Sequence, residues 1–179
     1  MLYTTNYDSP LGRLLLAGDG EKVIGLWMEG QKYFGAGLGG EAVEKDDLPL
    51  FHSVKSWLDR YFRGEKPAIA ELPLAPVGSD FRKAVWQILC EIPYGECITY
   101  GDIAARVAAT MHKESMSGQA VGGAVGHNPI SVIIPCHRVV GAGGSLTGYA
   151  GGIDKKIALL KLEGVDTARL TIPLSGTAL

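Results

Sequence analysis

The sequence lacks long apolar runs, paired cysteines and a pronounced charge of either sign. No apolar run in the 179 residues approaches the ~20 residues that span a bilayer. The N-terminus has neither the basic nor the apolar region of a secretion signal. The three cysteines include no C-x-x-C pair, which fits a reducing compartment better than a disulfide framework. We therefore expect a cytoplasmic protein that does not bind membranes.

The net charge of −2 does not indicate a polyanionic partner. The charge is unevenly distributed, however. Residues 1–80 contain 8 basic and 12 acidic side chains, whereas residues 81–179 contain 9 basic and 7 acidic ones. The C-terminal half is therefore the better candidate for a nucleic-acid-binding surface, although so small an excess does not decide the question.

What the sequence does contain is an ordinary globular composition, with 46% hydrophobic and 20% charged residues. Short apolar runs at Leu14–Ala17 and Val23–Met28, bounded by glycines, predict strands. Pro49–Phe62 has apolar side chains at helical spacing and a glycine beyond its end, so it predicts an amphipathic helix. Residues 66–78 are rich in proline and alanine, and we interpret them as a linker between two domains.

The second half of the chain predicts helices. An apolar stripe over Phe81–Leu89 indicates the first, and Thr99 followed by Asp102 has the pattern of a capping box that opens the second. Gln119–Val125 predicts a third helix after a polar loop. Helices joined in this order resemble a helix-turn-helix arrangement.

The segment Ile130–Val140 contains the residues most suited to chemistry. Its apolar, β-branched run is interrupted by Cys136, His137 and Arg138, and burying these in a strand costs free energy unless each has a partner. Cys136 could be a packed core thiol, because free cysteines are among the most buried residues. The adjacent imidazole favours the alternative, in which a base takes the thiol proton and the thiolate is a nucleophile. Neighbouring strand residues point to opposite faces, so direct contact of Cys136 with His137 requires a turn or an intervening water.

Glu163 is the last residue of a further predicted helix, whose spacing puts Ile153, at its start, Ile157 and Leu160 on the buried face. The helix dipole disfavours an anion at this end by ~0.3–1 kcal/mol. Glu163 could be a solvated surface carboxylate, which is the usual situation. It could instead orient His137 and complete a relay of nucleophile, base and carboxylate.

The other cysteines are weaker candidates for a nucleophile. Cys90 lies near the apolar stripe of its helix, where we expect it in the core. Cys97 has no ionisable neighbour beyond Glu96, and an anion there would disfavour the thiolate. The histidines other than His137 show no ligand spacing with one another or with cysteine, so we expect no metal site.

Two glycines, Gly122 and Gly123, lie inside the predicted third helix. Glycine in a helix costs ~1 kcal/mol relative to alanine, so these positions suggest that something approaches the backbone closely. A neighbouring helix is the more ordinary explanation for this pattern. A nucleic-acid groove is the other.

These segments resemble the O6-alkylguanine-DNA alkyltransferases (methylated-DNA–protein-cysteine methyltransferases) over nearly the whole chain. Pro135-Cys136-His137-Arg138-Val139, preceded by Asn128-Pro129, is similar to the active-site signature of that family and is highly specific for it. Less specific likenesses are Ser9-Pro10-Leu11-Gly12, Pro93-Tyr94-Gly95-Glu96, Thr99-Tyr100-Gly101, Gly148-Tyr149-Ala150-Gly151-Gly152 and Leu159-Leu160-Lys161-Leu162-Glu163-Gly164.

The resemblance implies an α/β (α+β) fold of two domains. Residues 1–78 would form a small N-terminal β-sheet and helix domain of the ribonuclease H type, ending in the linker. Residues 79–179 would form a C-terminal helical domain with a helix-turn-helix DNA-binding motif and the active site. The implied function is repair of double-stranded DNA that contains O6-alkylguanine, with O4-alkylthymine as a further candidate. A monomer would flip the base out and take its alkyl group irreversibly, once per molecule, without a cofactor.

The resemblance also implies roles for individual residues. Cys136 is the alkyl acceptor, His137 the general base acting through a water, and Glu163 the group that holds His137. Asn128 braces the turn before the nucleophile, and the Tyr100 hydroxyl contacts the guanine and the rotated phosphate and is placed to protonate the leaving base. The implied substrate- and DNA-binding positions are Gln119, Ala120, Gly122, Val139, Tyr149 and Ala150.

The chain departs from the family pattern at Gln119, where most members have an arginine that fills the space left by the flipped base. Glutamine can hydrogen-bond the orphaned base but has no charge. We therefore predict weaker and less salt-sensitive DNA binding than in an arginine-bearing relative. A Cys–His–Glu hydrolase of small esters or amides would use the same residues, but it would turn over. A lesion-binding protein without transfer fits less well, because such proteins replace the nucleophile and Cys136 is present.

Overall fold

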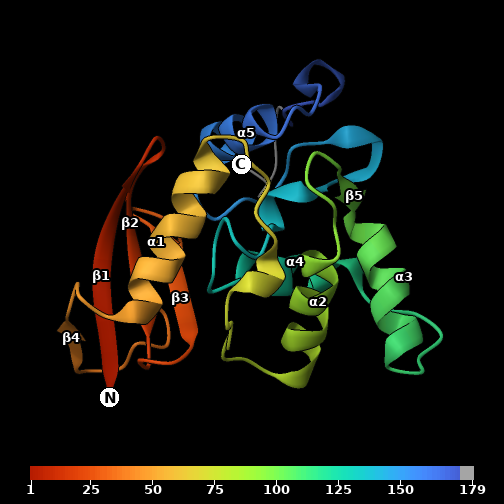
Figure 1. Ribbon diagram of the computed structural model, residues 1–179. Helices are drawn as coiled ribbons and strands as arrows, with labels where there is room; N and C mark the ends of the chain where they lie inside the picture. The colour runs from red at the N-terminus through yellow and green to blue at the C-terminus, as the bar shows by residue number, and fades with distance from the viewer. Residues whose placement is uncertain (174–179) are drawn as a thin grey trace. The chain divides into compact units, whose positions relative to one another are not determined.

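The computed structural model describes residues 1–173, which form two compact units (Figure 1). The first consists of Met1–Val77 and the separate segment Pro129–Ile133, and the second begins at Gly78 and contains the rest. The domains expected from the sequence are 1–78 and 79–179. That division does not predict that Pro129–Ile133 belongs to the first unit. Residues 174–179 of the expected second domain lie outside the described residues.

The first unit is built on a four-stranded sheet in the order β3-β2-β1-β4. β1 (Leu2–Ser9), β2 (Gly12–Gly18) and β3 (Val23–Met28) pair antiparallel in sequence, and β4 (Ala42–Glu44) adds parallel to β1. The predicted strand at β3 is confirmed in full, and the prediction for β2 lies within its bounds. β1 and β4 were not predicted because neither contains an apolar run.

Helix α1 (Pro49–Phe62) packs on this sheet against β1 and β2, with the bounds that the sequence predicts. Proline at its first position has no N–H to lose, and Gly64 beyond its end has a positive φ of 82°, which suits the residue after a helix. Its apolar stripe is buried as predicted, at Leu50, Phe51, Val54, Trp57, Leu58 and Tyr61.

Residues 66–78 were predicted as a linker, but residues 66–77 are part of the first unit and Gly78 begins the second. The Trp57 indole donates to the carbonyl of Ala68 at 2.8 Å, and a short 3₁₀ helix, η1, covers Ile69–Glu71. Further along, the backbone of Val23 bonds to both Pro73 and Ala75 at 2.8 Å, beside β3. Composition alone suggested a spacer, but these bonds fix the segment against the sheet.

The segment Pro129–Ile133 also runs beside β3. The backbone of Leu26 bonds to Pro129 and to Ser131, each at 2.8 Å, and the Ser131 hydroxyl donates to the side-chain carbonyl of Gln31 at 3.2 Å. Val132 has a φ of 69°, which is unusual for a β-branched residue. The N–H of residue 133 bonds to the carbonyl of Ser131 at 2.8 Å across it, as in a tight γ-turn. The first unit therefore anchors the stretch that leads to Cys136.

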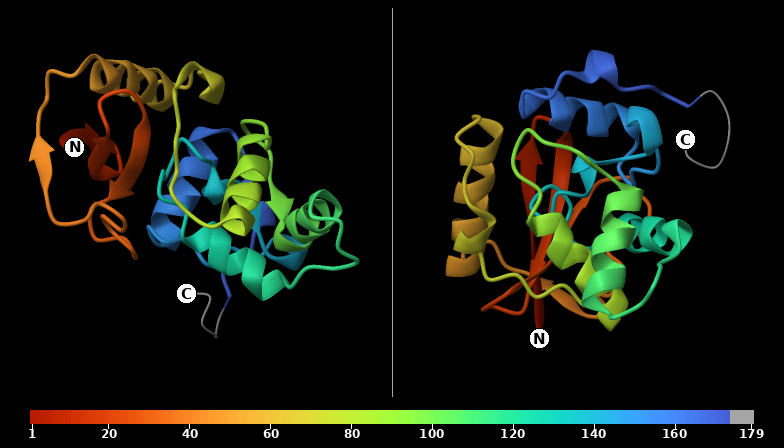
Figure 2. Two further views of the ribbon diagram at one scale, coloured as in Figure 1. Left: turned by 90° about the horizontal axis from the view of Figure 1, so that it is seen from below. Right: turned by 90° about the vertical axis from the view of Figure 1, so that its right-hand side faces the viewer.

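As far as residue 173, the second unit contains four α-helices and a two-stranded parallel sheet. Its helices and strands are α2 (Asp80–Cys90), β5 (Ile98–Thr99), α3 (Tyr100–Thr110), α4 (Gly118–Gly126), β6 (Val139–Val140) and α5 (Ile153–Leu162). Short 3₁₀ helices cover Cys136–Arg138 (η2), Ala142–Gly144 (η3) and Thr167–Arg169 (η4). Helices α2, α3 and α4 lie together in all views (Figures 1 and 2), and the buried Trp86 indole of α2 donates to the Ala124 carbonyl of α4 at 2.8 Å.

The predicted cap of α3 is confirmed, whereas α2 and α4 each begin one residue before the predicted Phe81 and Gln119. Ser79 and Ser117 accept backbone N–H groups at the starts of α2 and α4, and Thr99 with Asp102 forms the expected capping box of α3. Residues 111–117 join α3 to α4, which is longer than the 3–4-residue turn of a standard helix-turn-helix.

Helix α5 differs in one respect from its prediction. Leu160 is buried as expected, but Ile157 is only half-buried, and Lys156 is completely buried in its stead. Over residues 1–173, no helix is both long enough and apolar enough to cross a membrane.

Candidate active site

Cys136 lies in a turn and not in the strand that the apolar run suggested. Cys136–Arg138 form η2, and β6 begins only afterwards. Pro135, with φ −83° and ψ 64°, is the centre of an inverse γ-turn closed by the Cys136 N–H and the Ile134 carbonyl at 2.8 Å. The strand prediction fails here because proline fixes φ and has no N–H for a ladder. In a turn, Cys136 and His137 need not face opposite sides.

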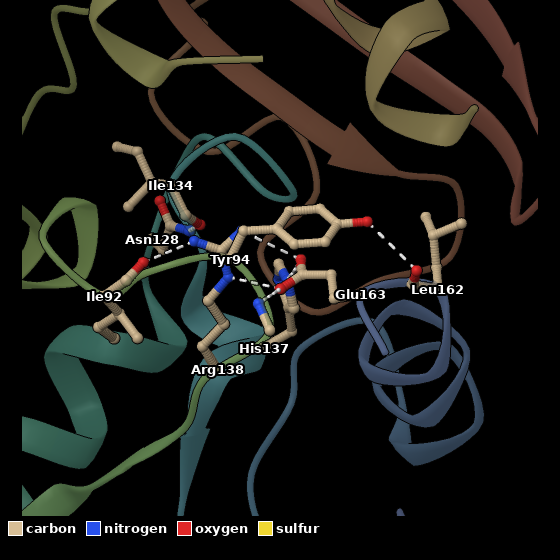
Figure 3. A network of polar contacts seen from close by, with 9 residues as sticks. Ile92, Tyr94, Asn128, Ile134, His137, Arg138, Leu162 and Glu163 are labelled. Atoms are coloured by element: carbon tan, nitrogen blue, oxygen red, sulfur yellow. Dashed lines mark hydrogen bonds and ion pairs between the residues drawn. The ribbon is translucent and has the colours of Figure 1, made fainter. Parts of the chain in front are cut away.

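Asn128 braces this turn from the end of α4. Its side chain is 4% exposed, and its amide nitrogen donates to the Ile134 carbonyl at 2.8 Å and to the Cys136 sulfur at 3.2 Å. Figure 3 shows Asn128 beside Ile134. An N–H directed at sulfur stabilises the thiolate relative to the thiol. Asn128 therefore both fixes the turn and favours ionisation of Cys136.

The carboxylate of Glu163, directly after α5, is the centre of a buried polar network (Figure 3). It contacts His137 Nε2 at 2.6 Å and Arg138 at 2.7 and 3.1 Å, and it accepts the N–H of Gly95 at 3.2 Å. Burial alone would raise the pKa of Glu163, but the bonds from His137 and Arg138 outweigh it and lower the pKa to about 2. Glu163 is thus an anion in the interior, not a solvated surface group.

Arg138 supplies the positive charge of this network. Its third contact is to the Ile92 carbonyl at 2.7 Å, and its guanidinium lies 5.6 Å from the centre of the Tyr94 ring. The sequence indicates that a buried Arg138 requires partners but does not identify them. All of its partners come from distant parts of the second unit, so only the fold could reveal them.

His137 is held in one tautomer. Burial lowers its pKa, and the bond to Glu163 only partly restores it, so the ring is neutral at pH 7. Because Nε2 faces a carboxylate, that nitrogen carries the hydrogen and Nδ1 carries the lone pair. Nδ1 is buried and has no hydrogen-bond partner among the described residues. The imidazole therefore has a free basic nitrogen next to Cys136 in the chain.

The Cys136 thiol needs such a base. Burial raises its pKa, and the Asn128 hydrogen bond and the Lys156 charge counteract this only in part. Burial raises the pKa of Cys90 to about 11. Burial also raises the pKa of Cys97. Cys97 has more ionisable neighbours than the sequence suggested, because the fold brings Lys156 near it, along with the Arg138–Glu163 pair.

Two tyrosines and a backbone stretch complete the surroundings of Cys136. Tyr100, the first residue of α3, donates its hydroxyl to the Thr147 carbonyl at 3.1 Å, and burial raises its pKa. Tyr149 and Ala150 lie in residues 141–152, between β6 and α5, and Val139 begins β6. The Tyr149 hydroxyl is buried, has no hydrogen-bond partner within residues 1–173, and lies close enough to Cys136 for the two to interact electrostatically.

Lys156 is the residue of this site that sequence analysis missed. Its ammonium donates to the Val139 carbonyl at 2.5 Å and to the Thr147 carbonyl at 3.0 Å. A signal was present, because Lys156, Leu159, Leu160 and Glu163 are spaced for one helix face. A lysine on an otherwise buried face was not recognised as a buried residue.

Helix α4 presents an open backbone. Gln119 and Ala120 are exposed and Gly122 is half-buried. A Cβ added at Gly122 or Gly123 would have no atom of the described chain within 4 Å. The more ordinary explanation of these glycines, a neighbouring helix of the same chain, is therefore wrong. These residues lie far from Cys136 in the sequence. Within residues 1–173, no hydrogen bond joins residues 119–123 of α4 to the polar network around Glu163.

The described part of the chain offers no candidate metal site. Among residues 1–173, no three histidine, cysteine, aspartate or glutamate side chains lie close enough together to hold an ion. A buried cysteine that precedes a neutral imidazole held by a carboxylate is the arrangement typical of proteins that use cysteine as a nucleophile.

Comparisons with known proteins specify the family. Residues 1–76 match the model of the 6-O-methylguanine DNA methyltransferase ribonuclease-like domain, and residues 80–165 match that of the DNA binding domain of the same family. The chain belongs to the 6-O-methylguanine DNA methyltransferase family. Both expected parts of the fold, the ribonuclease-like α+β domain and the helical DNA-binding domain, are thereby confirmed.

Individual relatives agree over nearly the full length. A methylated-DNA–protein-cysteine methyltransferase of Haemophilus influenzae is 44% identical over 92% of this chain and 87% of its own, and one of Methanosarcina acetivorans is 43% identical over 91% and 99%. The crystal structure of Mycobacterium tuberculosis OGT in complex with DNA matches with a TM-score of 0.77 and 40% identity, over 94% of each chain.

Proposed function

We propose that this protein repairs duplex DNA by moving the alkyl group of O6-alkylguanine to the sulfur of Cys136. Membership of the family establishes the class of reaction, a methyl transfer from DNA to a protein cysteine. The assignment to Cys136 depends on one observation. Of the three cysteines, it is the one that receives an N–H from Asn128 and that is followed by the neutral, carboxylate-held imidazole of His137.

The geometry supports the following sequence of events. The Cys136 thiol gives its proton, through a water, to Nδ1 of His137, and Glu163 stabilises the resulting imidazolium. The sulfur then attacks the alkyl carbon, so that an S–C bond forms while the C–O6 bond breaks and its electron pair goes to the guanine. The Tyr100 hydroxyl gives a proton to the departing base and recovers one, by way of solvent, from His137. The thioether is stable, so each chain reacts once.

Access to the alkyl group requires an everted nucleotide, because O6 cannot be reached inside the duplex. The open backbone of α4 suits this task. With small residues at Ala120 and Gly122, the helix could enter a groove closely, and Gln119 would occupy the space that the base leaves. Tyr149 and Ala150, in the loop before α5, would contact the everted base together with the backbone of Val139.

Intact mass spectrometry tests this function. The protein is mixed with a duplex that carries one O6-methylguanine, and each chain should gain the mass of one methyl group in place of a hydrogen, mapped to Cys136 by peptide analysis. The Cys136→Ser variant should gain none, whereas Cys90→Ser should behave as the parent does. A Cys–His–Glu hydrolase would release product continuously from an activated ester and leave the protein unmodified. That result, or methylation elsewhere in the chain, would refute the proposal.

The residue at position 119 is expected to set the salt dependence of DNA binding. Each phosphate neutralised by a cation changes the slope of log K against log salt by about −0.9. Gln119→Arg should therefore bind the duplex more tightly at low salt and show a slope steeper by up to about one unit. Fluorescence anisotropy across a salt series measures both quantities. The control is Gln87→Arg, which adds the same charge on an exposed position of α2. Equal affinity and slope for Gln119→Arg and the parent would contradict the prediction.

We further propose that the protein acts in the cytoplasm, as a monomer. A nucleophilic thiol must stay reduced to react, and the three cysteines are all free. Fractionation of cells that express a tagged chain tests the location, and light scattering should give the mass of a single chain at all protein concentrations.

A further inference from the structure

Lys156 is a completely buried lysine, the only one among residues 1–173. It lies in the first half of α5, and the two hydrogen bonds of its ammonium go to backbone carbonyls, not to a carboxylate. Burial lowers its pKa to about 8, and the nearby Cys136 and Cys97 thiols oppose this shift. At neutral pH the side chain therefore still carries its proton, although the interior disfavours the charge.

The two carbonyls belong to different parts of the site. Val139 lies three residues after Cys136, at the start of β6, and Thr147 lies in the 141–152 segment that also carries Tyr149 and Ala150. The Thr147 carbonyl also accepts the Tyr100 hydroxyl at 3.1 Å. The Lys156 ammonium thus joins the strand that follows the nucleophile to the loop before α5. The Tyr100 hydroxyl joins the same loop to the start of α3.

A neutral apolar residue could fill the same volume without the penalty of a buried charge. An ammonium offers something that such a residue does not, namely several donors that fix two carbonyls at once. The electrostatic interaction with Cys136 adds a second effect, because a positive charge near sulfur favours the thiolate. When Lys156 loses its proton the charge disappears, and the two N–H donors that remain form weaker, uncharged hydrogen bonds to the carbonyls.

We propose that Lys156 is a positioning residue for alkyl transfer, whose ammonium holds the loop of Tyr149 and Ala150 against the strand that follows Cys136. The inference rests on the function proposed above. It predicts that the transfer step, and not the binding of DNA, depends on the charged form of this side chain.

The pH dependence of transfer should reveal that charge. The ionisable groups that face Lys156 are the Cys136 and Cys97 thiols and the His137 imidazole. Loss of the His137 proton makes the rate rise with pH, because only the neutral ring accepts the thiol proton, whereas deprotonation of Lys156 makes the rate fall above about pH 8. The rate at saturating DNA should therefore be highest below that pH.

Single-turnover methyl transfer at saturating O6-methylguanine duplex, followed from pH 6 to 10, tests the inference. Misplacement of groups around a reacting centre lowers rates by about 10- to 100-fold, and we expect a loss of this size for Lys156→Met, with an unchanged Kd for DNA and no falling limb. Lys156→Arg keeps the donors and the charge but does not titrate in this range, so it should restore much of the rate and also lack the falling limb. Lys161→Met, which removes an exposed charge from the same helix, should match the parent.

The possible results separate this inference from the proposed function. A parent chain that takes up no methyl would overturn both. A parent that takes up methyl, together with a Lys156→Met variant of equal rate and pH profile, would overturn the role of Lys156 alone. Should Lys156→Met fail to fold, the parent profile decides by itself, because a rate that does not fall above pH 8 would contradict the inference.

Discussion

Replacing Glu163 with glutamine is expected to slow methyl transfer by about 10²–10⁴-fold, the usual contribution of general base catalysis. Glu163 keeps the hydrogen of His137 on Nε2 and so leaves Nδ1 basic. An amide in its place can donate to Nε2 as well as accept from it, and the ring can then carry its hydrogen on Nδ1. In that tautomer His137 has no lone pair for the thiol proton. Single-turnover transfer at saturating DNA measures the effect.

The same substitution should lower the free energy of unfolding by about 3 kcal/mol, since removing one partner of a buried ion pair leaves an uncompensated charge. The guanidinium of Arg138 is the group left without its anion, and its remaining bond to Ile92 does not neutralise it. Urea denaturation gives the difference. Glu65→Gln is the matched control, because its ion pair with Arg63 is exposed and should contribute less than about 1 kcal/mol. Equal losses for the two variants would contradict the prediction.

Acid should reveal the same carboxylate. The pKa of Glu163 is about 2 in the folded protein but ~4.3 in an unfolded chain. Its stabilising effect is therefore complete above that higher pH and is lost as the pH falls toward 2. His137 acts in the same direction, because burial lowers its pKa below 6.5, so the unfolded chain gains a proton first as the pH falls. The parent should lose stability over this whole range, and Glu163→Gln should lack the part below about pH 4.3.

The elements that the sequence predicted well are those whose signal is local. Pro49–Phe62 carries its own apolar stripe, N-terminal proline and following glycine, and α1 has those bounds. The capping box of Thr99 and Asp102 likewise needs only four consecutive residues. β1 was missed because its inward-facing residue Thr5 is polar and is satisfied by Asp46 and Lys55, which come from far along the chain.

The site shows the same division. Cys136, His137 and Arg138 stood out because their side chains interrupt an apolar run. Glu163 is 26 positions from His137, and without the resemblance nothing in the sequence joined them. The helical spacing of Lys156 put it on a buried face, but it was missed because nothing in the sequence indicates the two backbone carbonyls that its ammonium binds. The return of Pro129–Ile133 to the first unit depends on backbone bonds to Leu26, which are equally invisible in a sequence.

Alanine at both Gly122 and Gly123 is expected to stabilise the protein while weakening its hold on DNA. Neither glycine has a positive φ, and a Cβ at either position would contact no other part of the described chain. Replacing glycine by alanine within a helix stabilises it by ~1 kcal/mol per position, so the free energy of unfolding should increase. The added methyl groups would instead meet whatever approaches α4 from outside.

If that partner is a DNA groove, the two methyl groups of α4 would press against the floor of the groove. They should lower the affinity for DNA by about tenfold or more, which corresponds to ~1.4 kcal/mol. Fluorescence anisotropy with a lesion-bearing duplex measures the affinity, and urea denaturation measures the stability. Alkylation of Cys136 by iodoacetamide serves as the control, since a small reagent does not need α4 and should react as fast as with the parent. Loss of stability would mean that the glycines serve the fold. Unchanged affinity would mean that DNA does not approach this face of α4. The two measurements separate the roles, because a structural role predicts that the methyl groups lower the free energy of unfolding, whereas a groove-binding role predicts that they raise it and weaken DNA binding.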